Sequence, residues 1–226
     1  MIAAHGFLGV PLETFEQAGR EQLIALLGRG LNPESTILDF GCGCLRIAYW
    51  LVRFLDPLRY CGIEPARGRV EIGLEHLFDD EILRIKQPRF DFNADFDPSA
   101  FAARFDYMLA RSIWSHASKR QIEMMLDAFV RYANPNGVLM TSYLPTESAD
   151  NTYQAFLTAR FPQRCEPGGY DRDEWVGTSH ESDVPGVVQH SLRWIAEQCA
   201  RRGLRVSELP GVDCDQQVWL AIERAS

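Results

Sequence analysis

The segment Asp39-Phe40-Gly41-Cys42-Gly43 places a carboxylate beside a glycine turn, and Glu64 follows later in the chain. Glycines let a backbone approach a ligand closely, and a helix that begins after the turn offers free N–H donors. A pyrophosphate would be repelled by Asp39, whereas the ammonium group of an amino acid would be attracted to it. An acid about 20 residues after such a turn can accept both hydroxyls of a ribose. Glu64 therefore indicates a nucleoside ligand, and Asp39 favours one that carries an amino group.

These residues need parallel strands to bring them together, and the rest of the sequence predicts such strands. Short apolar runs predict strands over 35–41, 59–64, 105–113, 138–144, 204–209 and 217–223, with another inside 88–96. Helical periodicity predicts helices over 12–29, 45–55, 70–78, 119–133 and 187–202, with a turn at 134–137. Strands that alternate with helices predict parallel strands joined by right-handed crossovers, in a three-layer α/β sandwich.

Composition and charge narrow the classes of partner. The 226 residues carry a formal net charge of −8, which disfavours nucleic acid as a partner. No apolar run approaches the roughly 20 residues of a membrane helix, and the N-terminus does not resemble a secretory signal. The 6 cysteines include no CxxC pair, which predicts reduced thiols in a cytoplasmic protein and no metal site.

Several segments resemble the class I methyltransferases that use S-adenosylmethionine (SAM). ILDFGCG and GIEP are similar to motifs I and II of that family, and FDYMLARSIWSHAS is similar to its fourth-strand segment. RYANPNGVLMTSYL resembles the turn into its fifth strand, and GLRVSEL with QVWLAI resembles its reversed final hairpin. The resemblance covers 31–144 well and 187–223 loosely. Cys44-Leu45-Arg46 departs from the usual further glycine and is similar to the GCGxLR form of a bacterial branch.

The resemblance implies a Rossmann-like αβα sandwich with a seven-stranded, mostly parallel sheet and a C-terminal antiparallel hairpin strand. It implies one methyltransferase domain over 1–226. Its parts would be an N-terminal helical cap over 1–30, a cofactor-binding core over 31–144, an insertion that receives the acceptor over 145–186, and a final helix with two strands over 187–226. Gly19 lies where related enzymes close an N-terminal helix over the cofactor.

The resemblance also implies which residues bind SAM. They are Asp39, Gly41, Cys42, Gly43, Glu64, Pro65, Asp95, Phe96, Ala110 and Arg111. Asp39 and the glycine turn would face the methionine and ribose, and Glu64 would hold the ribose. Asp95 would meet the adenine amino group with Phe96 beside the ring, although a turn-capping role for Asp95 is an open alternative. Ala110 and Arg111 would line the methionine side.

We expect methyl transfer to an oxygen or nitrogen of a small-molecule acceptor, with His116 as the candidate base if the acceptor must lose a proton. A structural role for His116 is the alternative, and His180 and His190 are expected to be structural or exposed. The aromatic side chains that could line an acceptor pocket, or simply anchor a loop, are Tyr143, Tyr170 and Trp175.

Two other functions stay open. A non-catalytic SAM-binding module or partner subunit would carry the same cofactor motifs. A dehydrogenase that uses NAD would need a third glycine in GxGxxG, where this chain has Arg46, and would give Asp39 no purpose. The sequence shows neither the acceptor nor the oligomeric state.

Overall fold

The computed structural model describes residues 12–145, 189–209 and 217–225, in two compact units that divide between Leu109 and Ala110. Along the described chain the strand order is β3-β2-β1-β4-β5-β8-β7, with the short strand β6 paired to β5. Strands β1 to β4 are parallel where they pair, and β8 is antiparallel to both β5 and β7. Helices flank the sheet, so the predicted Rossmann-like fold with its C-terminal antiparallel strand is confirmed.

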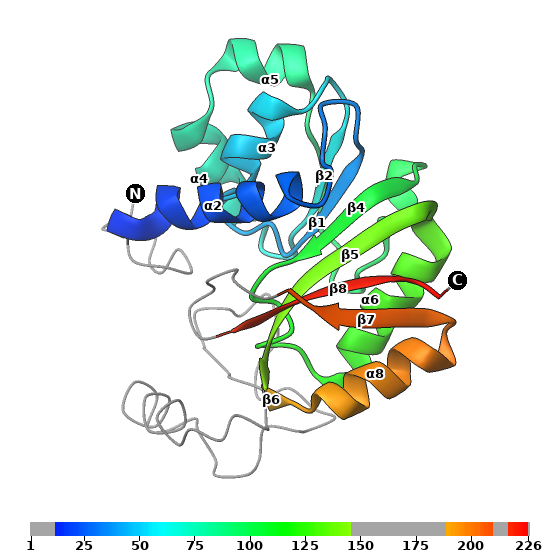
Figure 1. Ribbon diagram of the computed structural model, residues 1–226. Coiled ribbons are helices and arrows are strands. Elements are labelled where there is room, and N and C mark those ends of the chain that lie inside the picture. The colour runs from blue at the N-terminus through cyan, green and yellow to red at the C-terminus, as the bar shows by residue number, and fades with distance from the viewer. Residues whose placement is uncertain (1–11, 146–188, 210–216, 226) are drawn as a thin grey trace. The chain divides into compact units, whose positions relative to one another are not determined.

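The first unit carries the strand that precedes the glycine turn. Its strands are β1 (Ile37–Phe40), β2 (Tyr60–Ile63), β3 (Arg89–Asp91) and β4 (Phe105–Ala110, whose last residue begins the second unit). Every residue of β1 and β2 is buried, as expected for central parallel strands covered on both faces. The helices around them are α2 (Leu12–Leu27), α3 (Ala48–Phe54), α4 (Arg67–Leu77) and α5 (Asp80–Lys86), as Figure 1 shows.

The second unit contains the antiparallel strands β5, β8 and β7, the short strand β6 and two amphipathic helices. Its elements are α6 (Lys119–Tyr132), β5 (Ala133–Pro145), β6 (Gln189–His190), α8 (Leu192–Arg201), β7 (Leu204–Glu208) and β8 (Val218–Arg224). A capping box of Ser118 and Gln121 begins α6, and Ser191 caps α8. Gly203, with φ of +66°, follows the end of α8, where the left-handed conformation favours glycine. Helix α8 runs along β7 (Figure 1).

The sequence analysis was wrong about one turn and missed one helix. No turn forms at 134–137, because the chain runs extended from Ala133 and Pro135 favours that conformation. Helix α5 was missed because none of its residues is buried, so it shows no apolar stripe; Asp79 caps it instead. The strand predicted inside 88–96 is present as β3, which has three residues, and a short 3₁₀ helix, Pro98–Phe101, follows it.

The domain boundaries of the sequence analysis stay predictions. Of the expected insertion over 145–186, only Pro145 lies within the described residues, and of the expected cap over 1–30, residues 1–11 lie outside them. Tyr170, Trp175 and His180 also lie outside the described residues.

Candidate functional site

Asp39 is a buried carboxylate on β1, with 3% of its surface exposed. The hydroxyl of Tyr60, the first residue of β2, donates a hydrogen bond of 2.8 Å to its Oδ2. Burial raises the pKa of Asp39 to about 7, against the lowering effects of the Tyr60 hydrogen bond and the Arg46 charge; the Glu64 carboxylate adds to the rise. Near neutral pH this carboxyl is therefore partly protonated, and a cation beside it would favour the ionised form.

The glycine turn after β1 is held by the carbonyl of Ile63, the last residue of β2. Gly41 N–H donates to this oxygen at 2.8 Å and Cys42 N–H at 3.2 Å. Gly41 and Gly43 have φ of +65° and +52°, which explains the need for glycine at both positions. Among the described residues, a Cβ placed on Gly43 would meet nothing closer than the Gly41 carbonyl oxygen, at 3.9 Å. As far as this part of the chain is concerned, the space above Gly43 is therefore open to a ligand.

Glu64 joins the end of β2 to the glycine turn. Gly43 N–H donates to Glu64 Oε2 and Ala66 N–H to Oε1, both at 3.0 Å. The side chain is 5% exposed, so these bonds fix a buried carboxylate directly beside the turn. An ionised carboxylate has about four acceptor positions, so Glu64 can accept more hydrogen bonds than these two.

Cys42 and its neighbours shape the turn from within the protein. The Cys42 thiol is buried, its pKa is raised by that burial, and a Cβ on Gly62 would lie 2.8 Å from its sulfur. The side chain therefore packs on β2, so any contact of Cys42 with a ligand would come from its backbone. The described cysteines, 42, 44, 61 and 199, form no disulfide.

Leu45 lies in the segment Cys44-Leu45-Arg46, which lacks the further glycine expected from the resemblance. It is fully buried and has φ of +64°, so a branched side chain is held in a backbone conformation that favours glycine. Helix α4 approaches so closely that a Cβ on Gly73 would lie 2.7 Å from both Leu45 Cγ and the Cys44 carbonyl oxygen. Tight packing therefore keeps the strained turn in place.

Gly19 brings α2 against the other side of the same segment. A Cβ on Gly19 would lie 2.6 Å from the Arg46 carbonyl oxygen, and Trp50 Nε1 donates to the Glu16 carbonyl oxygen at 3.3 Å. This contact positions α2 against the start of α3, and the closure of this helix over the cofactor at Gly19 stays a prediction.

The loop after β3 holds Asp95 and Phe96. Asn93 organises this loop, since its Oδ1 accepts the N–H groups of Asp95 and Asp97 at 3.1 Å each. Asp97, not Asp95, caps the following 3₁₀ helix. Asp95 is exposed, whereas Phe96 is buried with its ring edge-on to Phe40 at 6.0 Å. The capping role belongs to Asp97, and the predicted adenine contact of Asp95 stays a prediction.

Ala110 and Arg111 follow the register of β4, in which Leu109 pairs with Asp39 of β1. Within the second unit, Arg111 Nη1 hydrogen-bonds to the hydroxyl of Ser112 and, at 3.4 Å, to that of Ser142 on β5. Ser142 also accepts Ser112 N–H at 2.9 Å and donates to Gln217 at 2.8 Å. This network orients Arg111 directly after β4, and sequence reasoning missed its Ser112, Ser142 and Gln217.

The candidate base, His116, is half-buried in the turn between β4 and α6. Its backbone N–H donates a hydrogen bond of 2.8 Å to the Ile113 carbonyl oxygen. His190 is fully buried, bonds through Nε2 to the Ala117 carbonyl oxygen at 2.9 Å, and stacks on Trp194. The structural role predicted for His190 fits this placement. Within the described residues, no group of three or more His, Cys, Asp or Glu is arranged to hold a metal ion.

Comparison with known proteins connects part of the chain to a family. The sequence model of the methyltransferase domain matches residues 38–139, which include most of β1, the glycine turn, Glu64 and β4. Residues 38–139 therefore match a methyltransferase domain, and the chain has the class I methyltransferase fold. SAM is the cofactor of such a domain, as the sequence predicted.

Solved structures share the fold of this methyltransferase domain. Magnesium protoporphyrin IX methyltransferase from Synechocystis PCC 6803, with bound S-adenosylhomocysteine (SAH), is similar with a TM-score of 0.60 and 16% identity, over 99% of this chain and 92% of that chain. An O-methyltransferase family protein from Burkholderia thailandensis gives a TM-score of 0.59 and 15% identity, over 95% of this chain and 59% of that chain.

A curated relative adds sequence similarity without a function. It is an uncharacterized protein of Rickettsia prowazekii strain Madrid E, 28% identical over 137 residues, 57% of this chain and 52% of that protein. The match therefore spans about half the length of the relative.

The first unit of the methyltransferase fits SAM. Asp39 suits the methionine ammonium group, and the Glu64 carboxylate is a hydrogen-bond acceptor of the kind that suits ribose hydroxyls. The open space above Gly43 lets the ligand lie directly against the protein backbone. When bound, SAM supplies a methyl group activated by its positively charged sulfur.

Proposed function

We propose that this protein transfers the methyl group of SAM to an oxygen or nitrogen atom of a small-molecule acceptor. The observation that carries the proposal is the pair of buried carboxylates, Asp39 and Glu64, beside a glycine turn with open space above it. The methyltransferase family of residues 38–139 supports the same reaction.

The chain's contribution to catalysis is chiefly alignment. Attack on an activated methyl group needs the acceptor atom in line with the bond that breaks, and holding two reactants in that geometry contributes roughly 7–11 kcal/mol. The hydrogen bonds of Tyr60 to Asp39 and of Gly43 to Glu64 fix the two carboxylates before any ligand arrives. Binding therefore needs little rearrangement of these side chains.

A small acceptor is favoured over nucleic acid. The net charge of −8 repels phosphate backbones. The segment ARSIWSH after β4 also lacks the Asn/Asp-Pro-Pro-aromatic motif that is usual in enzymes that methylate amino groups of nucleic acids. The O-methyltransferase family protein among the similar structures agrees with an oxygen acceptor.

We expect the reaction in the cytoplasm. In the described chain no helix has the length and apolarity to cross a membrane.

His116 is the proposed general base where the acceptor is a hydroxyl group. It stands in the turn directly after β4, six residues beyond the end of that strand. For an acceptor hydroxyl, His116→Ala should lower kcat by about 100-fold or more while leaving SAH affinity unchanged. Full turnover by this variant would remove His116 from the mechanism.

A transfer assay tests the proposed function. The protein is incubated with SAM labelled on the methyl group and with three acceptor pools: small hydroxyl and amine compounds, total RNA, and a protein extract. Label should enter the small compounds. Label in RNA or protein alone would contradict the proposed acceptor class, and intact SAH binding without transfer to any pool would favour the non-catalytic module.

A further inference from the structure

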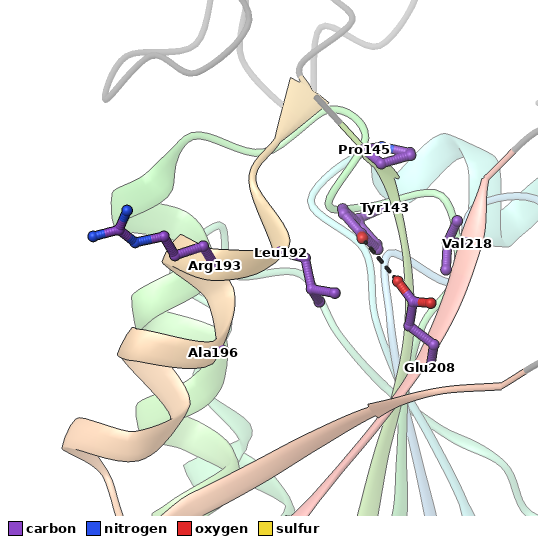
Figure 2. Close-up of a pocket in the computed structure, with 7 residues that line it drawn as sticks. All are labelled: Tyr143, Pro145, Leu192, Arg193, Ala196, Glu208 and Val218. Atoms are coloured by element: carbon purple, nitrogen blue, oxygen red, sulfur yellow. Dashed lines mark hydrogen bonds between the residues drawn. The ribbon is translucent and has the colours of Figure 1, made fainter. Parts of the chain in front are cut away.

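The second unit contains a pocket of about 580 Å³ that lies outside the cofactor residues described above. Figure 2 shows the seven residues that line it: Tyr143, Pro145, Leu192, Arg193, Ala196, Glu208 and Val218. Pockets that bind small molecules in proteins have volumes of about 300–1,000 Å³, so this one is large enough for a compact ligand.

The pocket lies at the carboxyl ends of two strands. Strands β5 and β7 are both antiparallel to β8, so they run in the same direction and end at the same edge. Tyr143 and Pro145 close β5, Glu208 closes β7, and the first turn of α8 brings Leu192 to the other side. In Rossmann-like sheets, ligands bind at this edge.

The walls of the pocket are mostly apolar, with one polar end. Leu192, Ala196 and Val218 offer aliphatic surface from two different elements. At the polar end the Tyr143 hydroxyl donates to Glu208 Oε1 at 3.4 Å, the dashed line in Figure 2. A ligand that fits this surface has an apolar body and a group that binds a carboxylate.

Charges around the pocket leave the polar end negative. Arg193 points away from Glu208 in Figure 2, and its Nε lies 3.1 Å from Glu197 Oε1. Arg205, on the same strand as Glu208, pairs with Glu223 of β8 at 2.7 Å. Within the described residues Glu208 takes part in no ion pair, so a cation on the ligand is the complementary group.

We propose that this pocket binds an apolar small molecule through an ammonium group that Glu208 anchors. This site stands on residues of the second unit alone, and its test does not depend on the proposed function.

Three probes of nearly equal shape test the anchor. Calorimetric titrations of the full chain use 2-phenylethylamine, 2-phenylethanol and 3-phenylpropionate, which share a phenyl body and differ in charge. The amine should bind about three- to tenfold more tightly than the alcohol, because a charge-assisted hydrogen bond replaces a neutral one, and the carboxylate should bind most weakly.

Two variants decide whether Glu208 is responsible. Glu208→Gln should abolish the preference for the amine, whereas Glu197→Gln, an exposed carboxylate on α8 paired with Arg193, should keep it. Ala196→Phe should weaken binding of all three probes by filling the pocket. Equal affinities for the probes, no binding of any, or an unchanged preference in Glu208→Gln would overturn the proposal. SAH is titrated in parallel, so a failure of the cofactor site is seen separately from a failure of the pocket.

Discussion

Asp39 is buried in a place where its ionised form is costly for the folded protein. The carboxylate loses water and gains, among the described residues, only the Tyr60 hydroxyl as a hydrogen-bond donor, so its pKa rises from 3.8 to about 7. A shift of this direction lowers stability at neutral pH, because the unfolded chain ionises the group more easily. The residue is thus suited to a cationic ligand at the expense of fold stability.

Replacing Asp39 should therefore stabilise the fold in a pH-dependent way. The stability cost of Asp39 is absent below pH 3.8, grows as pH rises toward about 7, and is constant above that value. Asp39→Asn keeps an acceptor for Tyr60 and removes the charge. In urea unfolding, the free energy of unfolding of the variant minus that of the wild type should rise by up to about 3 kcal/mol from pH 5 to pH 8. An unchanged difference across this range would contradict the buried ionisable state of Asp39.

SAM binding should release a proton through the same group. Below a pKa of about 7 the free protein holds Asp39 largely protonated, and the methionine ammonium group favours the carboxylate. At pH 6 the apparent binding enthalpy should therefore vary with the ionisation enthalpy of the buffer, and this variation should be much smaller in Asp39→Asn. Equal buffer dependence in the two proteins would show that Asp39 does not meet the ammonium group.

At position 45 a glycine should give a more stable protein than an alanine, the reverse of their usual order. Both substitutions lose the buried leucine, which costs about 2–5 kcal/mol, but only glycine relieves a backbone at φ of +64°. Leu45→Gly should be more stable than Leu45→Ala by about 1 kcal/mol in thermal unfolding. The ordinary order, with alanine more stable, would mean that the turn relaxes once leucine is removed.

At the scale of elements, three contacts hold the cofactor turn: β2 through Ile63 and Glu64, α4 through Gly73, and α2 through Gly19. The turn is thus held by the strand beside it and by two helices that approach closer than any Cβ allows. Its geometry is a property of these elements and not of the glycines alone.

Gly19→Ala should test the contact of α2. Its Cβ would lie 2.6 Å from a backbone carbonyl oxygen, so α2 must shift, and both the melting temperature and SAH affinity should fall. Gly68→Ala is the matched control, since that glycine is also in a helix and has nothing within 4 Å of its Cβ. The free energy of unfolding of the control variant should rise by about 0.5–1 kcal/mol. Equal effects of the two substitutions would mean that α2 does not press on the turn.

At the scale of the whole molecule, the sequence predicted most of what depends on local pattern. Buried runs such as Ile37–Phe40 and the apolar stripe of α6 predicted their elements, and strand parallelism predicted that Asp39, Gly43 and Glu64 meet. What it missed depends on pairing between distant segments. The Tyr60 bond to Asp39 follows from the register of β1 with β2, and the pocket joins Leu192, Glu208 and Val218 from three elements. Helix α5 has no buried residue and so left no periodic signal.

The most direct test is a calorimetric titration of the purified protein with SAM, SAH and NAD, repeated with Asp39→Ala and Glu64→Gln. The account predicts micromolar binding of SAM and SAH, no binding of NAD, and a loss of at least about tenfold in affinity for both adenosyl ligands in each variant. Binding of NAD alone, or SAM affinity unchanged in both variants, would contradict the assignment of the site to Asp39, Glu64 and the glycine turn.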